Sequence, residues 1–444
     1  MAVAAAVAAA TKHRSLVKKM MRIPVKRHKK NTTIARLACA ALTLPGIMHT
    51  ATAGRVEETY NADFQYGHYS ESDKRIDVNI FEGALSAPLG KALTVDVNLV
   101  RDVISGASPV YNQNIKGKIK QIISAASAKS SCGQSICEER NAITSGLTYF
   151  FDAASINLNG GYSKENDYQS RYVGSNLSLD LGNKKLTTLN FGASVAFDEI
   201  DPSVSPWAHS TAKNGRIHES KTSQSYLLGV TQIIDKDSLF QSNQTFSYSN
   251  GYLTDPYKWV EVKVANPWFS FSLPIEEVRP GEKFQWAWLN QYVRHFGQLN
   301  NAALHLDYRF TKDDWGIDSH TFEASWHQPI ADGWQLIPRF RYYSQTSADF
   351  YQPTFSGKLS NDFRRLKNHS AYSSDYRLAG FGAISGGIKL TKEITNLKSI
   401  NQLNFQTGIE YYDHQAGYRL DGNSLGHFAD FSYYLVTASF NLKF

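Results

Sequence analysis

Residues with the types needed for hydrolytic chemistry occur at three places in this chain. Gly422-Asn-Ser-Leu-Gly426 matches the letters G-x-S-x-G of a serine nucleophile motif, and Asp413-His414 and His369-Ser370 are adjacent pairs of triad residue types. That motif works only as a strained turn between a strand and a helix, whereas this segment reads as a surface loop. Neighbours along a strand face opposite ways, so neither pair can act on one substrate. We therefore predict no catalytic residues and no enzyme activity.

Two acidic clusters could attract cations. Asp198-Glu-Ile-Asp201 and Asp313-Asp314 carry carboxylates of the kind that bind Ca²⁺ or the cations of lipopolysaccharide, although solvated acids are the simpler reading. The histidines show no metal-ligand spacing. We predict no metal site and no cofactor.

Cys132 and Cys137 are the two cysteines beyond the amino-terminal region. In an oxidising compartment they predict a disulfide that closes Cys-Gly-Gln-Ser-Ile-Cys. The alternative is a redox or metal pair, but a metal would need further ligands nearby. The disulfide is the reading we favour.

An oxidising compartment is expected because residues 1–53 read as a signal peptide. A basic stretch precedes a short apolar run, Leu37–Leu44, and Ala51-Thr-Ala53 offers a cleavage site before Gly54. The run is too short for a transmembrane helix, which needs about 20 residues. The leader is long, and Met20 or Met21 would give a more ordinary start.

The positive charge of the chain comes from this leader. It holds 10 of the 47 Lys and Arg residues and no acid, which leaves 37 basic residues against 40 acidic ones in residues 54–444. The remainder is slightly acidic, so we predict no nucleic-acid partner.

The elements that must carry any function are strands, and the last of them is the clearest. Phe444, Leu442, Phe440 and Tyr434 lie on one face of a strand, and the intervening polar residues lie on the other. This strand resembles the closing strand of a bacterial outer-membrane β-barrel, in which the terminal aromatic residue helps the assembly machinery recognise the chain. We take these four residues as a candidate assembly signal.

Similar alternation recurs through residues 54–444 in about 16 segments (range 14–18), within the even numbers found in such barrels. Short connections alternate with long ones. The long connections are 103–141, 200–221, 251–282, 346–374 and 413–429. The sequence therefore predicts an all-β fold, a transmembrane antiparallel up-and-down β-barrel with short periplasmic turns and long extracellular loops.

The connection 103–141 differs from the rest. Ile115, Ile119, Ile122, Ile123 and Ala126 recur at helical spacing, which predicts a short amphipathic helix before the cysteine pair. It could form a constriction folded into the pore or a loop that caps the rim, and the sequence does not separate the two.

Several polar side chains fall on the face that we assign to the lumen. Charges of both signs could set ion selectivity in a channel or could form a structural network that fixes strand register, and we favour the structural role. The candidate lumen-facing residues are Asp307, Arg309, Glu323, Arg339, Arg341, Gln402, Asn404, Gln406 and Glu410.

Several motifs give this chain a specific resemblance. Those in the middle of the chain are Asn250–Lys258, Arg279-Pro280, Ala303–Arg309, Asp313–Ile317, Ser319–Thr321 and Arg341–Tyr351; Val103–Pro109 and Ser374–Ala379 flank them. They resemble an uncharacterised family of predicted Gram-negative outer-membrane β-barrels, the domain-of-unknown-function family DUF3570. The resemblance implies a barrel without an assigned activity. It also implies a link to periplasmic redox maturation, because members are encoded near thioredoxin-like proteins, a small lipoprotein and a flavin transferase.

Three functions follow as expectations. The first is a channel, porin-like or part of an export or maturation system, in the Gram-negative outer membrane. The second is a structural barrel with a filled lumen that recruits a periplasmic lipoprotein or thioredoxin-like protein. In either case the expected partners are the lipid bilayer, lipopolysaccharide and the assembly machinery. An outer-membrane hydrolase is the third and least favoured function.

Overall fold

The computed structural model describes residues 59–72, 76–115, 118–125, 137–202, 217–265, 270–361, 363–397, 400–422 and 430–444. The leader and Cys132 lie outside these residues, so cleavage and the disulfide stay predictions. Among the described residues, no helix is long and apolar enough to cross a membrane.

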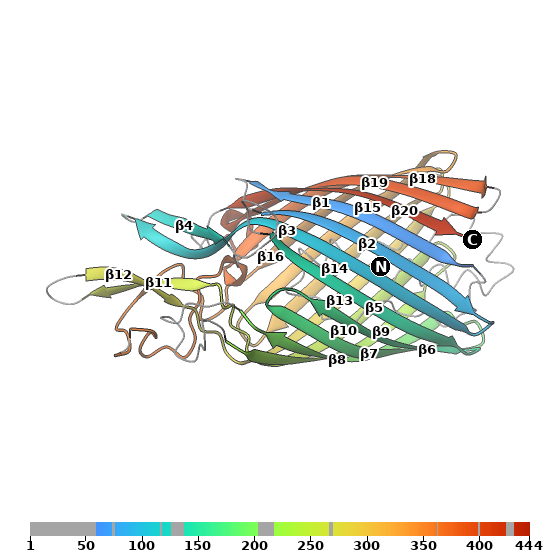
Figure 1. Cartoon of the computed structure of the whole chain (residues 1–444). Coiled ribbons are helices and arrows are strands. Elements are labelled where there is room, and N and C mark those ends of the chain that lie inside the picture. Colours follow the sequence, from blue (N-terminus) through green and yellow to red (C-terminus); the bar gives the residue numbers. More distant parts are fainter. Residues whose placement is uncertain are drawn as a thin grey trace.

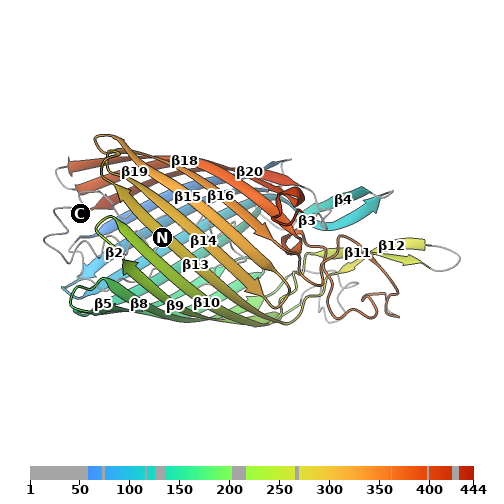
Figure 2. The ribbon, with the colours of Figure 1, turned by 180° about the vertical axis from the view of Figure 1, so that it is seen from behind.

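Sixteen antiparallel strands close into a single barrel (Figures 1 and 2). Each strand pairs with the next barrel strand along the chain, and β20 returns to pair with β1. The barrel strands are β1 (Asn61–Glu71), β2 (Ile76–Leu89), β3 (Leu93–Ile115), β5 (Cys137–Phe150), β6 (Ala154–Lys164), β7 (Tyr168–Leu181), β8 (Thr187–Ile200), β9 (Glu219–Ile233), β10 (Ser238–Gly251), β13 (Glu282–Phe296), β14 (Ala302–Asp313), β15 (Asp318–Ala331), β16 (Trp334–Gln345), β18 (Phe381–Leu397), β19 (Ile400–Gln415) and β20 (Phe431–Lys443). The predicted fold class is confirmed.

The two faces of the barrel wall differ in polarity. On β20, Tyr434 is 56% exposed whereas Tyr433 before it is 5% exposed, and Val436 and Thr437 repeat the contrast. Every barrel strand exposes at least one large apolar or aromatic side chain in this way. One for each strand in order is Phe64, Phe81, Leu99, Ile143, Ile156, Val173, Phe191, Leu228, Tyr248, Phe284, Leu306, Phe322, Phe340, Ile388, Ile409 and Phe440.

The buried face of the same strands carries polar side chains. Examples are Gln65 on β1, Asn157 on β6, Asn190 on β8 and Gln241 on β10. Apolar side chains outside and polar side chains inside invert the pattern of a water-soluble protein, and they match a barrel that spans lipid around a polar interior.

At one end of the barrel the connections are tight turns. Several contain residues with positive φ, a conformation that favours Gly and Asn: Gly182 (φ 70°) follows β7, Asn300 (φ 53°) follows β13 and Gly333 (φ 68°) precedes β16. Lys443 at the end of β20 lies opposite Asn61 at the start of β1. The carboxyl terminus is drawn at this end in Figure 1.

The opposite end carries the long connections. The predicted helix at 115–126 is wrong: β3 continues to Ile115 and forms a hairpin with β4 (Lys118–Ala125). Isoleucine is β-branched and favours strands, so the apolar spacing that fitted a helix is equally compatible with a strand that has a partner beside it. This hairpin projects beyond the barrel (Figure 1), which fits a rim element for these residues and not a constriction.

Two further long connections, 252–281 and 346–380, fold together, and we call them the loop cap. The first contains β11 (Trp259–Ala265) and β12 (Ser270–Glu276); the second contains β17 (Phe355–Ser356) and the 3-10 turn η2 (Tyr376–Leu378). β17 pairs with β11 to form a three-stranded sheet. A second 3-10 turn, η3 (Ala416–Tyr418), follows β19.

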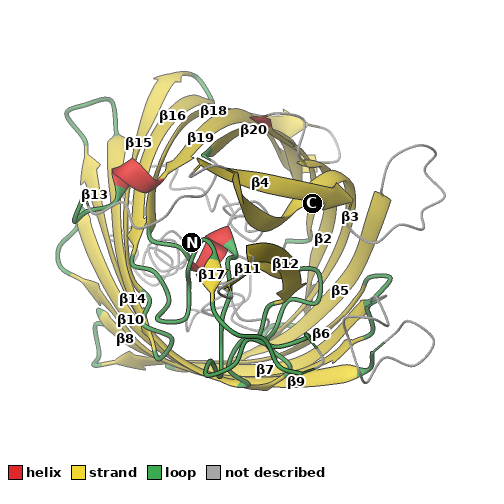
Figure 3. Cartoon of the chain, turned by 90° about the vertical axis from the view of Figure 1, so that its left-hand side faces the viewer, coloured by secondary structure: helices red, strands yellow, loops and turns green. Residues whose placement is uncertain are grey.

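The loop cap has its own apolar core. The core residues come from both connections and are Val260, Val262, Ile275, Phe355, Leu359, Leu366 and Tyr372. Seen along the barrel axis, β11, β12 and β17 lie in front of the opening (Figure 3). The two connections are therefore a folded unit over the long-loop mouth.

Candidate functional site

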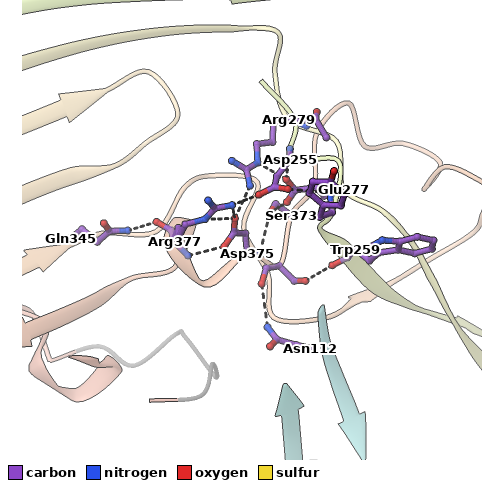
Figure 4. A network of polar contacts seen from close by, with 12 residues as sticks. Asn112, Asp255, Trp259, Glu277, Arg279, Gln345, Ser373, Asp375 and Arg377 are labelled. Carbon is purple, nitrogen blue, oxygen red and sulfur yellow. Dashed lines mark hydrogen bonds and ion pairs between the residues drawn. The ribbon is translucent and has the colours of Figure 1, made fainter. Parts of the chain in front are cut away.

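A buried cluster of charged side chains joins the two halves of the loop cap (Figure 4). Acids and bases are present in equal number. The first connection supplies Asp255, Lys258, Glu277 and Arg279, and the second supplies Asp375 and Arg377. We call these six residues the cap network.

Asp375 lies at the centre of the network. Its Oδ2 accepts hydrogen bonds from Nη2 of Arg279 at 2.7 Å and from Nε of Arg377 at 2.7 Å. Arg279 also pairs with Glu277, Nε to Oε1 at 2.6 Å, and Arg377 also pairs with Asp255. Each arginine therefore links two acids, and the chain of ion pairs crosses from one connection to the other.

The local backbone explains why these acids sit where they do. Asp375 caps η2, since its side chain accepts a hydrogen bond from the Arg377 amide. Asp255 accepts from the Tyr257 amide at 3.0 Å in the same manner. Ser373 donates to Glu277 through its hydroxyl, and that hydroxyl also accepts from the Asp375 amide at 3.0 Å.

Charge and burial set the protonation of the network. Although burial raises it, the pKa of the Asp375 carboxyl is held below its ordinary value by Arg377, Lys258 and Arg279. Burial lowers the pKa of Lys258, against the attraction of Asp375. Burial raises the pKa of Glu277, and the nearby carboxylates of Asp375 and Asp255 add to the rise while Arg279 opposes it.

The raised pKa of Glu277 predicts a pH-dependent cap. The folded cap binds this proton more tightly than the unfolded loops do, so the contribution to stability is full below about pH 4.3, the unfolded value, and is lost as pH rises through the raised folded value. The depressed pKa of Asp375 acts only at lower pH. The lowered pKa of Lys258 works in the opposite direction, because the folded cap binds that proton less tightly than the unfolded loops do, so the comparison with a Glu277 variant isolates the contribution of Glu277. We expect slower proteolysis of the loops at about pH 5 than at about pH 8, measured against an unfolded substrate of the same protease.

Glu277→Gln tests the assignment. The neutral amide imitates the protonated acid, so the variant should lose the faster cleavage at the higher pH that Glu277 causes. If cleavage of the Gln variant depends on pH as in the original protein, a group other than Glu277 is responsible.

The network is also tied to the barrel. Gln345 at the end of β16 donates through Nε2 to the carbonyls of Arg377 (3.0 Å) and Ala379 (2.7 Å). From β3, Asn112 donates to the Ser374 carbonyl at 3.3 Å, and the Asn114 amide donates to Glu261 at 2.7 Å. The cap is thus held by two strands from different parts of the wall.

A second group of charges lies inside the barrel, among the predicted lumen-facing residues. Arg339 donates to both oxygens of Glu323, at 2.8 Å and 2.7 Å, and to Glu410 at 2.7 Å. Arg339 and Glu410 face each other across Gly387 of β18 in the strand register. A Cβ at Gly387 would lie 2.8 Å from the Ile409 carbonyl and 3.2 Å from the Glu410 Cβ, so glycine keeps this bridge clear.

The other predicted lumen residues lie on neighbouring strands. Asp307 pairs with Glu323 and Glu323 with Arg341 in the register, while Arg309 lies opposite Thr321. Gln406 lies opposite Thr391 on one side and Ser439 on the other.

Gln402 and Asn404 belong to a chain of amides that crosses the seam of the barrel. Gln402 donates to Asn404 at 3.0 Å, Asn404 donates to Asn441 at 3.3 Å, and Asn441 donates to Asp63 at 2.5 Å. The chain links β19, β20 and β1.

Among the described residues, those with possible hydrolytic chemistry have other structural partners. Asp413 accepts from Gln415 and Tyr418, whereas His414 packs between Phe381 and Phe431. The segment 423–426 of the G-x-S-x-G match lies outside the described residues.

The acidic clusters are paired with cations of the chain. Asp198 pairs with Lys221 at 3.0 Å and Asp313 with Lys283 at 2.8 Å. Within the described ranges, no group of three or more His, Cys, Asp or Glu side chains could hold a metal ion.

The cap network was missed at the sequence level, although a signal was present. Asp255, Lys258, Arg279, Asp375 and Arg377 all fall in motifs that carry the family resemblance. Charged loop residues that belong to family motifs indicate a structural or functional role for those loops, because the packing of the barrel does not require them.

The closed barrel and its polarity define the class of this protein: a β-barrel of the outer-membrane type. The chain belongs to the family described as "Protein of unknown function (DUF3570)", whose profile matches residues 34–435. No curated protein matches its sequence.

Solved structures with a similar course of the chain include three outer-membrane-type proteins. A bacterial polysaccharide outer membrane secretin has 7% identity and a TM-score of 0.43, with 88% of this chain and 99% of that chain covered. The CymD monoaromatic hydrocarbon channel has 8% identity and a TM-score of 0.38, with 88% and 89% covered. CdiB from Acinetobacter baumannii has 8% identity and a TM-score of 0.45, with 88% and 60% covered. Similarities this low transfer no function to this chain.

Proposed function

We propose that this protein is a diffusion channel of the Gram-negative outer membrane whose extracellular mouth is covered by the loop cap. The observation that carries the proposal is the polar inner wall of a closed sixteen-stranded barrel. Barrels of this strand number are wide enough for an aqueous lumen. The cap network then limits access to that lumen from one side.

Conductance tests the proposal. The folded protein, purified in detergent and inserted into planar bilayers, should give stepwise ion currents, and liposomes that contain it should swell in small neutral solutes. Gel mobility before and after heating should verify the folded barrel in the same preparation. A folded barrel that passes neither ions nor small solutes would contradict the channel.

A second proposal rests on the hairpins that project beyond the rim. β12 is an edge strand of the cap sheet, and the β3–β4 hairpin stands clear of the barrel (Figure 1). Exposed strand edges can pair with a strand of another protein. In this case the barrel is a scaffold, and cross-linking on intact cells followed by purification should recover one partner in stoichiometric amount.

We also infer that residues 1–53 direct export. Expression in a Gram-negative cell should place the protein in the outer-membrane fraction, and amino-terminal sequencing of that protein should begin at Gly54. Recovery from the cytoplasm with residues 1–53 intact would show that the leader has another role.

A further inference from the structure

One sector of the inner wall, from β6 to β10, carries no charge between the two rims. The lumen charges around Arg339 come from β14 to β19, and the pair of Asp198 on β8 with Lys221 on β9 lies at the long-loop rim. On β6 to β10 the buried face between the two rims carries amides, hydroxyls and glycines instead. Those that are deeply buried include Ser155, Asn157, Asn176, Ser178, Asn190, Ser225, Thr231, Gln241 and Asn243.

Part of this uncharged wall is internally bonded. Asn157 donates to Thr148 at 2.9 Å, Ser178 donates to Asn190 at 2.9 Å, and Asn190 donates to Thr231 at 3.3 Å. These bonds hold the amides along the wall.

Glycines on adjacent strands make room for the amides. A Cβ at Gly192 would lie 2.7 Å from Oδ1 of Asn176, and a Cβ at Gly229 would collide with Oδ1 of Asn243. Glycine inside a strand weakens the strand and often marks a place where another group approaches closely. Here the approaching groups are the side-chain amides, which lie over the glycines.

Three amides on β10 and β13 stand out because hydrogen-bonding atoms of theirs have no partner among the described residues. The atoms without a partner are Oε1 and Nε2 of Gln241, Oδ1 of Asn243 and Oε1 of Gln291. Gln241 lies directly opposite Gln291 in the register, and Asn243 is the next residue on the same face of β10. We call these three residues the amide patch.

Unpaired buried amide atoms are costly, about 1–3 kcal/mol each, so the patch requires a ligand or water that both donates and accepts hydrogen bonds. The patch itself carries no charge, and the nearest inward charge in the register is the carboxylate of Asp307, opposite Gln291. An anion would be repelled by Asp307, and a cation would bind that carboxylate and not the uncharged amides. Hydroxyl groups match both the donors and the acceptors.

We propose that the amide patch is a subsite for an uncharged, hydroxyl-rich solute, a sugar or polyol, on its way through the lumen. This inference rests on the proposed channel function. It names the class of solute that the channel prefers.

The experiment measures liposome swelling with glucose, gluconate and glucosamine, which have similar size and different charge. The original protein should pass glucose faster than either charged analogue, with a rate that saturates. Gln241→Met and Gln291→Met keep side-chain length and remove the amide. Either should reduce the glucose preference roughly fivefold to tenfold, the effect of one or two lost hydrogen bonds.

Gln406→Met is the matched control, because Gln406 is an inward glutamine of β19 outside the patch. It should leave the preference unchanged. Passage of all three solutes at equal rates, or a preference that survives both patch variants, overturns the subsite, leaves the channel intact and assigns the patch to water. Passage of no solute by any folded variant rejects the channel itself.

Discussion

Replacing Asp375 with alanine should release the loop cap and raise the conductance of the barrel severalfold. The substitution removes the carboxylate that joins Arg279 to Arg377 and the cap of η2. Breaking a buried ion pair from one side typically costs about 3–5 kcal/mol. Arg279 keeps Glu277 and Arg377 keeps Asp255, but the buried network is left with one positive charge more than it has acids. A small loop unit cannot absorb such a loss and remain ordered.

Single-channel recording and limited proteolysis of the same preparation measure this effect. Loop cleavage should appear in the variant while the heat-dependent gel shift of the barrel persists. Asp421→Ala is the control, since this exposed acid pairs with Arg419 outside the cap network. Unchanged conductance together with unchanged cleavage would show that the network does not close the mouth.

Replacing Arg339 with alanine should lower the melting temperature of the barrel and shift its ion preference toward cations. The change leaves the carboxylates of Glu323 and Glu410 without the guanidinium that binds both. The three side chains are mostly covered (22%, 19% and 15% exposed), so we expect a loss of roughly 2–4 kcal/mol, below the value for a fully buried pair.

Arg309→Ala separates structure from charge. Arg309 is a predicted lumen residue on β14, so the control removes the same charge without breaking the bidentate bond to Glu323. A melting temperature lowered only by Arg339→Ala indicates a structural network, which is the role we favour. An equal shift of reversal potential in both variants with no change in melting would instead assign these charges to selectivity.

The strands could be predicted from the sequence because lipid imposes a strict rule on them. Outward residues such as Phe322 and Phe340 must be apolar while their neighbours face a polar interior, so the period of two is strong in every segment. The connection before β18 shows the limit of the rule. The sequence pattern predicts that this strand begins at residue 375. In the structure β18 begins at Phe381, because Asp375 caps the 3-10 turn η2.

The cap network could not be predicted in the same way. Arg377 and Asp255 are 122 residues apart and Arg279 and Asp375 are 96 apart, so only the folded loops bring them together. The helix predicted for Ile115–Ala126 was wrong for a related reason. Its own spacing fits two structures, and the choice was made by β3, which offered a partner strand.

The amides that cross from Gln402 to Asp63 have a consequence for how the barrel closes. The bond between Asn441 and Asp63 joins residues 378 positions apart, and no tight turn fixes the phase of β20 against β1. A slip by one residue would place Asp63 opposite Phe440 on the same face, which would send either Phe440 into the lumen or Asp63 into lipid. The side chains at the seam must therefore set the register of β20 against β1. Where two neighbouring strands are joined by a tight turn, the turn sets that register.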